Sequence, residues 1–160
     1  MRKKEFAYRS STSFRTVVWQ FRESGDIPVA IKDKGKIAVS GPEDVYRNFG
    51  FMFDGQVRER FVVLWLSAAN KVQGYEIISE GILNASLVAP REVFRGAIVA
   101  TAASIILAHN HPSGNPEPST EDKYITKQIV ESGKIIGITV HDHIIFTHSS
   151  YVSFAEKGLI

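Results

Sequence analysis

The strongest constraint on the fold of this chain is a buried strand that ends in two histidines and turns sharply into a helix. Residues 104–108, Ser-Ile-Ile-Leu-Ala, are a short apolar run that predicts a strand, and His109 and His111 follow it directly. Side chains two apart on a strand point to the same face, so both imidazoles are expected to point the same way. Pro112 cannot continue a central strand, and the sequence Pro-Ser-Gly-Asn-Pro is typical of a turn, so the chain is expected to leave the sheet here.

A helix is expected after this turn, and it carries an acidic residue on its inner side. Ser119 and Asp122, three residues apart, have the form of a capping box, and Ile125 and Ile129 follow at helical spacing. Gly133 is the expected end of this helix. Asp122 shares the stripe of the two isoleucines, so its carboxylate is expected to face the core, where it requires a cation.

These residues together predict a metal site. Two neutral imidazoles and one carboxylate are a normal three-ligand set for catalytic zinc, with water as the fourth ligand. We therefore expect one Zn²⁺ per chain, bound by His109, His111 and Asp122. The alternative is structural: Asp122 only caps its helix, and the two histidines make ordinary hydrogen bonds at a strand end.

The stretch from Leu107 to Asp122 resembles the JAMM metalloprotease motif, which reads His-x-His, seven residues, Ser, two residues, Asp. In detail it resembles the RadC family version, His-Asn-His-Pro-Ser-Gly followed by Pro-x-Pro-Ser and Asp. The resemblance extends over about Arg58 to Ile160, through residues 89–94 upstream and residues 142–144 and 151–153 downstream. Full-length RadC relatives usually carry a helix-hairpin-helix region before this part. Residues 1–40 show no such Gly-punctuated helical pair, so we expect a short form without it.

The resemblance implies a fold and an activity. The fold is a three-layer α-β-α sandwich that resembles the cytidine-deaminase fold. The activity is zinc-dependent hydrolysis of peptide or isopeptide bonds, in a family whose name is associated with DNA repair. Ser119 is then implied to hydrogen-bond the metal water or the oxyanion, while its ordinary role is to cap the helix.

Hydrolysis of this kind also needs a carboxylate that moves a proton. The candidates are Glu59, Glu76, Glu80 and Glu92, and the sequence alone does not choose, because each lies near the end of a predicted element. In JAMM proteins the catalytic Glu lies at the start of the strand after the first helix, and Glu59 matches that position. The alternative is that Glu59 is a surface residue between two arginines.

Composition agrees with a compact enzyme and excludes several other classes of metal-dependent enzyme. With 160 residues, 44% of them hydrophobic, the chain can bury one substantial core, and we expect a single domain over residues 1–160, with an extension at 1–41 and a catalytic core at 42–160. With no cysteine, thiolate zinc sites and the Pro-Cys-x-x-Cys motif of nucleoside deaminases are excluded. A (β/α)₈ amidohydrolase barrel needs about 250 residues. We expect a cytoplasmic protein, since no apolar stretch approaches a membrane span and no signal peptide is evident.

The order of predicted elements indicates an α/β (α+β) fold, a mixed β-sheet with helices on both sides. A capping box at Ser40 and Glu43 opens the first helix, which runs to about Phe51. Residues 14–22 are ambiguous between strand and helix. The other predicted elements are a hairpin of 27–33 with 36–40, strands at 61–66, 72–78, 82–88, 135–140 and 143–147, and a helix at 90–103.

Some polar residues are expected to play minor roles. His141 and His143 form a second His-x-His, but no carboxylate at a helical offset follows, so Asp142 and His143 are expected to support the metal ligands or to pack. The first residues of the chain could touch nucleic acid through Arg2, Lys3, Lys4, Phe6, Tyr8 and Arg9, yet a net charge of +2 is a weak electrostatic signal, and a solvated tail is the expected reading.

We expect a peptide or protein substrate. Two readings remain as alternatives: a metal-dependent phosphodiesterase acting on nucleic acid, and a non-catalytic nucleic-acid-associated module with a structural metal. Ligand count separates the last from an enzyme, because a structural zinc site is closed by four protein ligands.

Overall fold

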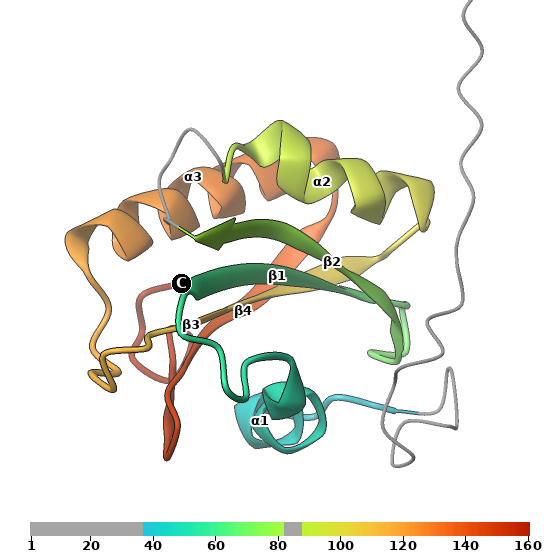
Figure 1. Ribbon diagram of the computed structural model, residues 1–160. Helices are drawn as coiled ribbons and strands as arrows, with labels where there is room; N and C mark the ends of the chain where they lie inside the picture. Colours follow the sequence, from blue (N-terminus) through green and yellow to red (C-terminus); the bar gives the residue numbers. More distant parts are fainter. Residues whose placement is uncertain (1–36, 82–87) are drawn as a thin grey trace, which may run out of the picture.

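The computed structural model describes residues 37–81 and 88–160, which form one mixed sheet with helices on both faces (Figure 1). The strand order is β2-β1-β3-β4-β5; β3 and β4 are parallel and the other neighbours are antiparallel. The expected α/β (α+β) class, a mixed sheet between helices, is confirmed. The elements are α1 (Pro42–Phe49), η2 (Gly50–Met52), β1 (Glu59–Leu66), β2 (Val72–Gly81), α2 (Pro90–Val99), β3 (Ser104–Asn110), α3 (Thr120–Ile136), β4 (Thr139–Phe146) and β5 (Tyr151–Ser153).

The strands in the middle of the sheet are buried on both faces. On β1, Phe61 and Val63 pack in a cluster with residues of α2 and α3, whereas Val62 and Leu64 pack in a second cluster with residues of α1. Figure 1 shows the same division, with α2 and α3 on one side of the sheet and α1 on the other. A strand covered on both faces needs apolar residues at every position, which is why residues 61–66 form a continuous apolar run.

Strand β1 lies directly beside β3, the strand that carries His109. The two run antiparallel, and Phe61 is opposite His109. Directly opposite residues project from the same face, so Phe61 and His109 both face α2 and α3, and their rings stack with centroids 6.0 Å apart. The start of β1 therefore lies beside the end of β3.

The capping box predicted at Ser40 and Glu43 is wrong. Helix α1 begins after Gly41, which makes no side-chain cap hydrogen bond, and Ser40 instead donates its backbone N–H to Asp44 Oδ2 at 2.8 Å. Pro42 occupies the first helical position, where its fixed φ suits a helix and its missing N–H costs nothing. The proline sets this helix start one residue later than the pattern indicated, with Gly41 in place of Ser40 as the N-cap.

The end predicted for the helix that carries Asp122 is also wrong. Helix α3 continues past Gly133 to Ile136 and ends at Gly137, whose φ of 82° is left-handed and suits glycine. Residues 135 and 136 are thus helical, and the two strands predicted between residues 135 and 147 are one continuous strand, Thr139–Phe146. Local apolar runs do not distinguish the last turn of a helix from a strand.

Gly133 has a packing role in place of the predicted stop. A Cβ there would lie 2.5 Å from the carbonyl oxygen of Ile138 and 3.2 Å from the ring of Phe94. We expect Gly133→Ala to lower the free energy of unfolding by about 1–3 kcal/mol through overpacking, although alanine favours helices. Denaturant unfolding checks this against Gly50→Ala, where a Cβ would meet no atom within 4 Å. A Gly133→Ala protein as stable as the wild type would contradict this close approach.

The remaining elements agree in type and differ in length. Strand β2 extends three residues beyond the predicted 72–78, and α2 ends at Val99, short of the predicted 103. β5 was not predicted. Three predicted segments lie outside the described residues: 82–87 of the predicted strand 82–88, the ambiguous segment 14–22, and the first strand of the predicted hairpin, 27–33. In the second strand of that hairpin, 36–40, Ala38 forms an isolated bridge with Lys71.

Among the described residues, no helix combines the length and the apolar character that a membrane crossing requires.

Candidate metal centre

The three predicted ligands meet between the end of β3 and the first turn of α3. His109 Nε2 lies 2.9 Å from His111 Nε2 and 3.2 Å from Asp122 Oδ1, and His111 Nε2 lies 3.5 Å from Asp122 Oδ2. His109 and Asp122 are buried, while His111 is partly exposed. These residues form a possible metal-binding site that is open to solvent on the His111 side.

The turn after β3 orients His111. Gly114, at a φ of 79°, donates its N–H to the carbonyl of His111 at 3.0 Å, and the turn brings the carbonyl of Asn115 to 2.6 Å from His111 Nδ1. A carbonyl can only accept, so Nδ1 carries the proton of the neutral ring. The lone pair of His111 Nε2 is thereby left to face His109 and Asp122, which is the usual arrangement of a metal-binding histidine.

The predicted capping box at Ser119 and Asp122 is confirmed, and it orients the carboxylate. Asp122 Oδ2 accepts from the backbone N–H of Ser119 at 2.7 Å and from its hydroxyl at 2.5 Å, and Asp122 N–H donates to Ser119 Oγ at 3.1 Å. These bonds hold Oδ2, so Oδ1 is the oxygen directed at His109. The cap that starts the helix therefore also fixes the direction of the third candidate ligand.

Electrostatics favour a positive charge at this point. Burial opposes ionisation of Asp122, but the neighbouring His109 and His111 rings and the Ser119 hydroxyl outweigh it and hold the pKa of this carboxyl far below its ordinary value. Burial lowers the pKa of His109, which favours the neutral ring. The neighbouring Asp122 carboxylate raises the pKa of His111. The cluster is thus an ionised carboxylate with imidazole lone pairs, and a cation among them compensates its charge.

The donor set fits zinc. Zinc binds imidazole nitrogen and carboxylate oxygen at about 2.0–2.2 Å, so two ligands of a tetrahedral ion lie about 3.3 Å apart. The separation of 2.9 Å between the two Nε2 atoms and that of 3.2 Å between His109 Nε2 and Asp122 Oδ1 are close to that value. Three protein donors leave one tetrahedral position open, as catalytic sites do.

Glu59 is the first residue of β1 and lies beside this cluster. It is two residues before Phe61, which faces His109, so by strand alternation its side chain is on the same face. Burial lowers the pKa of His109 and the Asp122 carboxylate raises that of His111, and the negative charge of Glu59 makes a smaller upward contribution to the pKa of both rings. Within the described residues, no hydrogen bond or ion pair engages its partly exposed carboxylate, which leaves the group free to act on a ligand of the site.

The other three candidate carboxylates are engaged elsewhere. Glu76 pairs with Arg95 at 2.6 Å, and Glu92 pairs with the same arginine at 2.8 Å. Glu80 pairs with Arg60 at 3.0 Å, and Arg60 also donates to a carbonyl of η2, on the α1 side of the sheet. Of the four candidates, only Glu59 is placed beside the histidines by the strand register.

Asn110 is a residue whose role the sequence analysis missed. Its buried side chain accepts the backbone N–H of Arg60 at 2.8 Å and donates to the carbonyl of Arg58 at 3.1 Å. These bonds hold the backbone on both sides of Glu59 against the end of β3. A buried asparagine between two histidines at a strand end was the available signal.

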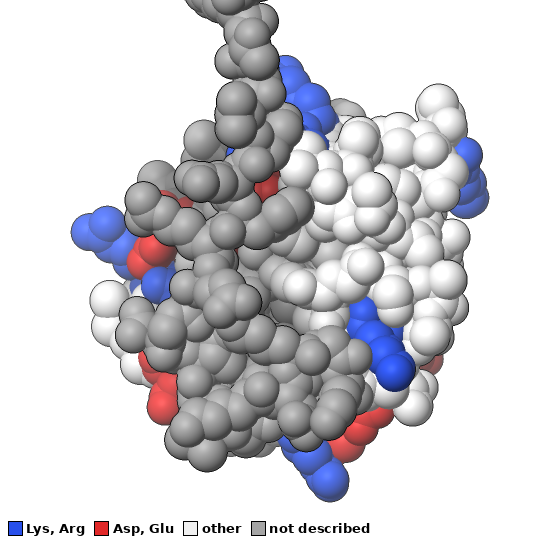
Figure 2. Space-filling view, turned by 90° about the vertical axis from the view of Figure 1, so that its right-hand side faces the viewer, with Lys and Arg blue, Asp and Glu red and all other residues white. Residues whose placement is uncertain are grey.

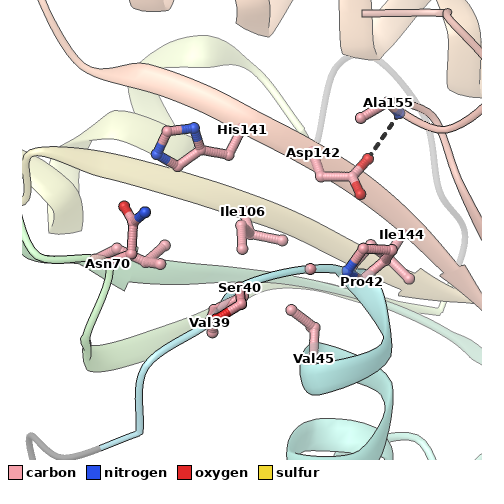
Figure 3. Close-up of a pocket in the computed structure, with 12 residues that line it drawn as sticks. Val39, Ser40, Pro42, Val45, Asn70, Ile106, His141, Asp142, Ile144 and Ala155 are labelled. Atoms are coloured by element: carbon pink, nitrogen blue, oxygen red, sulfur yellow. Dashed lines mark hydrogen bonds between the residues drawn. The ribbon is translucent and has the colours of Figure 1, made fainter.

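A separate cavity lies on the other face of the sheet and includes none of the three candidate ligands. It has a volume of about 240 Å³ and lies between the start of α1 and strands β3 and β4 (Figure 3). Val39, Ile106 and Ile144 supply apolar parts of its wall, and Asn70 and His141 supply polar parts. This cavity is therefore distinct from the candidate metal centre.

Comparison with known proteins places this site in a family. Residues 39–159 match the model of the RadC-like JAB domain, which is most of the chain. A UPF0758 protein of Methanosarcina mazei is 43% identical over 128 residues, 80% of this chain and 56% of that protein. One of Symbiobacterium thermophilum is 53% identical over 102 residues (64% and 44%), and one of Desulforamulus reducens 45% over 138 residues (86% and 61%).

The chain spans about half the length of these curated relatives, whose names assign no activity. The family match nevertheless covers every residue of the site, from Glu59 to Asp122. The resemblance stated from the motif is confirmed: the chain belongs to the RadC-like JAB domain family.

Proposed function

We propose that this chain is a zinc-dependent hydrolase that cleaves peptide or isopeptide bonds in a peptide or protein substrate. The observation that carries the proposal is the convergence of three acceptor groups, His109 Nε2, His111 Nε2 and the Asp122 carboxylate, with a carboxylate that is not a ligand beside them. Three ligands and a neighbouring acid/base are the composition of a hydrolytic zinc site. The family match to a JAB domain supports the same class.

Each residue of the site has a distinct role in the proposed reaction. His109, His111 and Asp122 would hold the ion, which when bound supplies Lewis acidity that activates water near neutral pH and polarises the scissile carbonyl. Glu59 takes the proton of the attacking water and delivers it to the leaving amine. The Ser119 hydroxyl, on an exposed residue at the rim, donates to Asp122 Oδ2 in this structure and would turn its single proton from there to the oxyanion that develops on the substrate.

A nucleic-acid substrate has weaker support. On the described surface seen in Figure 2, Lys and Arg side chains lie apart from one another, with Asp and Glu side chains among them, and form no continuous basic stripe. Nucleic-acid binding normally draws on clustered positive charge, and the described part of this face offers no such cluster.

Metal content and chelation test this proposal. We expect the protein purified without chelator to contain about one zinc per chain, and to hydrolyse a peptide or a Lys-ε-linked isopeptide substrate. A strong chelator should abolish this hydrolysis, and added zinc should restore it, because water is activated only with the ion in place. Elemental analysis and a fluorogenic peptide panel make the two measurements.

The same panel contains single-stranded and duplex DNA and RNA. Chelator-sensitive cleavage of nucleic acid without cleavage of any peptide would replace the proposal with a phosphodiesterase. Stoichiometric zinc without hydrolysis of any substrate class would indicate a metal that serves only structure.

A further inference from the structure

His143, on β4, lies buried directly behind the candidate ligand His109. Its Nε2 is 2.7 Å from His109 Nδ1, and its Nδ1 is 2.6 Å from the hydroxyl oxygen of Thr126 on α3. Its ring stacks on Phe154 and meets Phe61 edge-on, so it cannot turn freely. Both ring nitrogens are therefore engaged, one by the strand that carries His109 and one by the helix that carries Asp122.

The direction of these hydrogen bonds follows from one backbone group. Thr126 Oγ1 lies 2.6 Å from the carbonyl oxygen of Asp122, which can only accept, so the threonine proton goes there. Thr126 then has only lone pairs for His143, whose Nδ1 must donate. A neutral His143 with Nδ1–H has an accepting Nε2, so His109 donates from Nδ1. The lone pair of His109 is left on Nε2, the atom that faces His111 and Asp122.

A β-bulge in β4 directs His143 to this side of the sheet. Val140 is opposite Ile105, but Asp142 is opposite Ile106, so His141 is an extra residue in the strand. Bulges shift the alternation of side chains and re-aim them. Val140 and His143 consequently lie on the same face, although they are three apart in the sequence.

The carboxylate of Asp142 stabilises this bulge. Asp142 Oδ1 accepts the backbone N–H of His143 at 2.7 Å and of Ala155 at 2.9 Å, and Oδ2 accepts the hydroxyl of Ser153 at 2.6 Å. Figure 3 shows the bond to Ala155 beside the cavity that Val39, Ile106 and Ile144 line. A histidine that only filled space would need neither this bulge nor two matched hydrogen bonds.

We propose that His143 and Thr126 are positioning residues for the metal centre: they hold His109 in the tautomer that directs its Nε2 lone pair at the ion, and they link β3 to α3. This inference rests on the metal site of the proposed function. Metal-binding histidines commonly donate their other N–H to a fixed acceptor, and replacing that support typically weakens metal binding 10- to 100-fold.

The test compares Thr126→Val, which keeps the shape and removes the hydroxyl, with Thr126→Ser, which keeps the hydroxyl. Zinc affinity is measured by competition with a chromophoric chelator. We expect Thr126→Val to bind zinc roughly tenfold or more weakly and Thr126→Ser to stay within about threefold of the wild type. Equal affinities in all three proteins, or equal losses in both variants, would overturn the proposal, because the hydroxyl would then not matter.

A second measurement needs neither a variant nor a metal. Long-range ¹H–¹⁵N spectra of the metal-free wild type, with the five histidines assigned, should show His109 and His143 both protonated at Nδ1. Protonation of either ring at Nε2 would overturn the inference, and this spectrum decides even if Thr126→Val does not fold. A wild type that has these tautomers but binds no zinc would overturn the proposed function and leave the hydrogen-bond chain in place.

Discussion

Replacing Asp122 with asparagine should remove most of the zinc from the purified protein. Asparagine keeps the size of the side chain, and its carbonyl oxygen can still accept the Ser119 N–H that starts α3, but the negative charge that balances the ion is lost. Because a ligand contributes more than its support, we expect the zinc affinity to fall by at least about 100-fold. Elemental analysis after gel filtration, followed by chelator competition, measures the loss.

Glu131→Gln is the matched control for this variant. Glu131 is an exposed carboxylate on the same helix, so its removal changes the charge of α3 equally and leaves the site intact. We expect that variant to retain the zinc content of the wild type. An Asp122→Asn protein with wild-type zinc would show that the ion, if present, binds elsewhere.

Glu59→Gln should lower the rate of hydrolysis while the zinc content stays unchanged. Glutamine preserves volume and hydrogen bonding, and Glu59 is not one of the converging donors, so the variant should fold and keep its zinc. If Glu59 is the acid/base as proposed, the variant lacks the group that takes the proton of water, and we expect the rate of hydrolysis to fall by about 10²-fold or more. The measurement is kcat on the peptide or isopeptide substrate found in the panel, with zinc content determined on the same sample.

Glu80→Gln serves as the control for Glu59→Gln. Glu80 lies on the neighbouring strand and pairs with Arg60, so its replacement removes a nearby carboxylate from outside the site. We expect its activity to stay close to that of the wild type. Equal activity of Glu59→Gln and the wild type would exclude Glu59 as the acid/base, whereas loss of zinc from Glu59→Gln would indicate a role in holding the site together.

Much of the candidate site could be predicted from local spacing. Two residues apart on a strand share a face, and a serine three residues before an aspartate at a helix start forms a capping box; both rules follow from backbone geometry alone. They correctly brought His109, His111 and Asp122 together, and they placed Ser119 against Asp122. The apolar run of β1 likewise indicated a central strand.

The errors came where one local pattern fits two structures. The sequence predicts a helix end at Gly133 because glycine commonly ends helices, yet its lack of a side chain serves the close approach of Ile138. It predicts a strand at Ile135 and Ile136 because they are β-branched and apolar, yet they are the exposed last turn of α3. Only the position of neighbouring segments decides such cases.

The sequence by itself determined which residues can bind a metal, in which order they follow the strand and the helix, and that no thiolate takes part. Tertiary structure decided which other groups lie beside them. The β1–β3 register places Glu59, of the four candidate carboxylates, beside the histidines, and the bulge in β4 turns His143 towards His109. These choices depend on pairing between segments far apart in the chain, and a shift of one residue in such pairing reverses every side chain, so no local pattern encodes them.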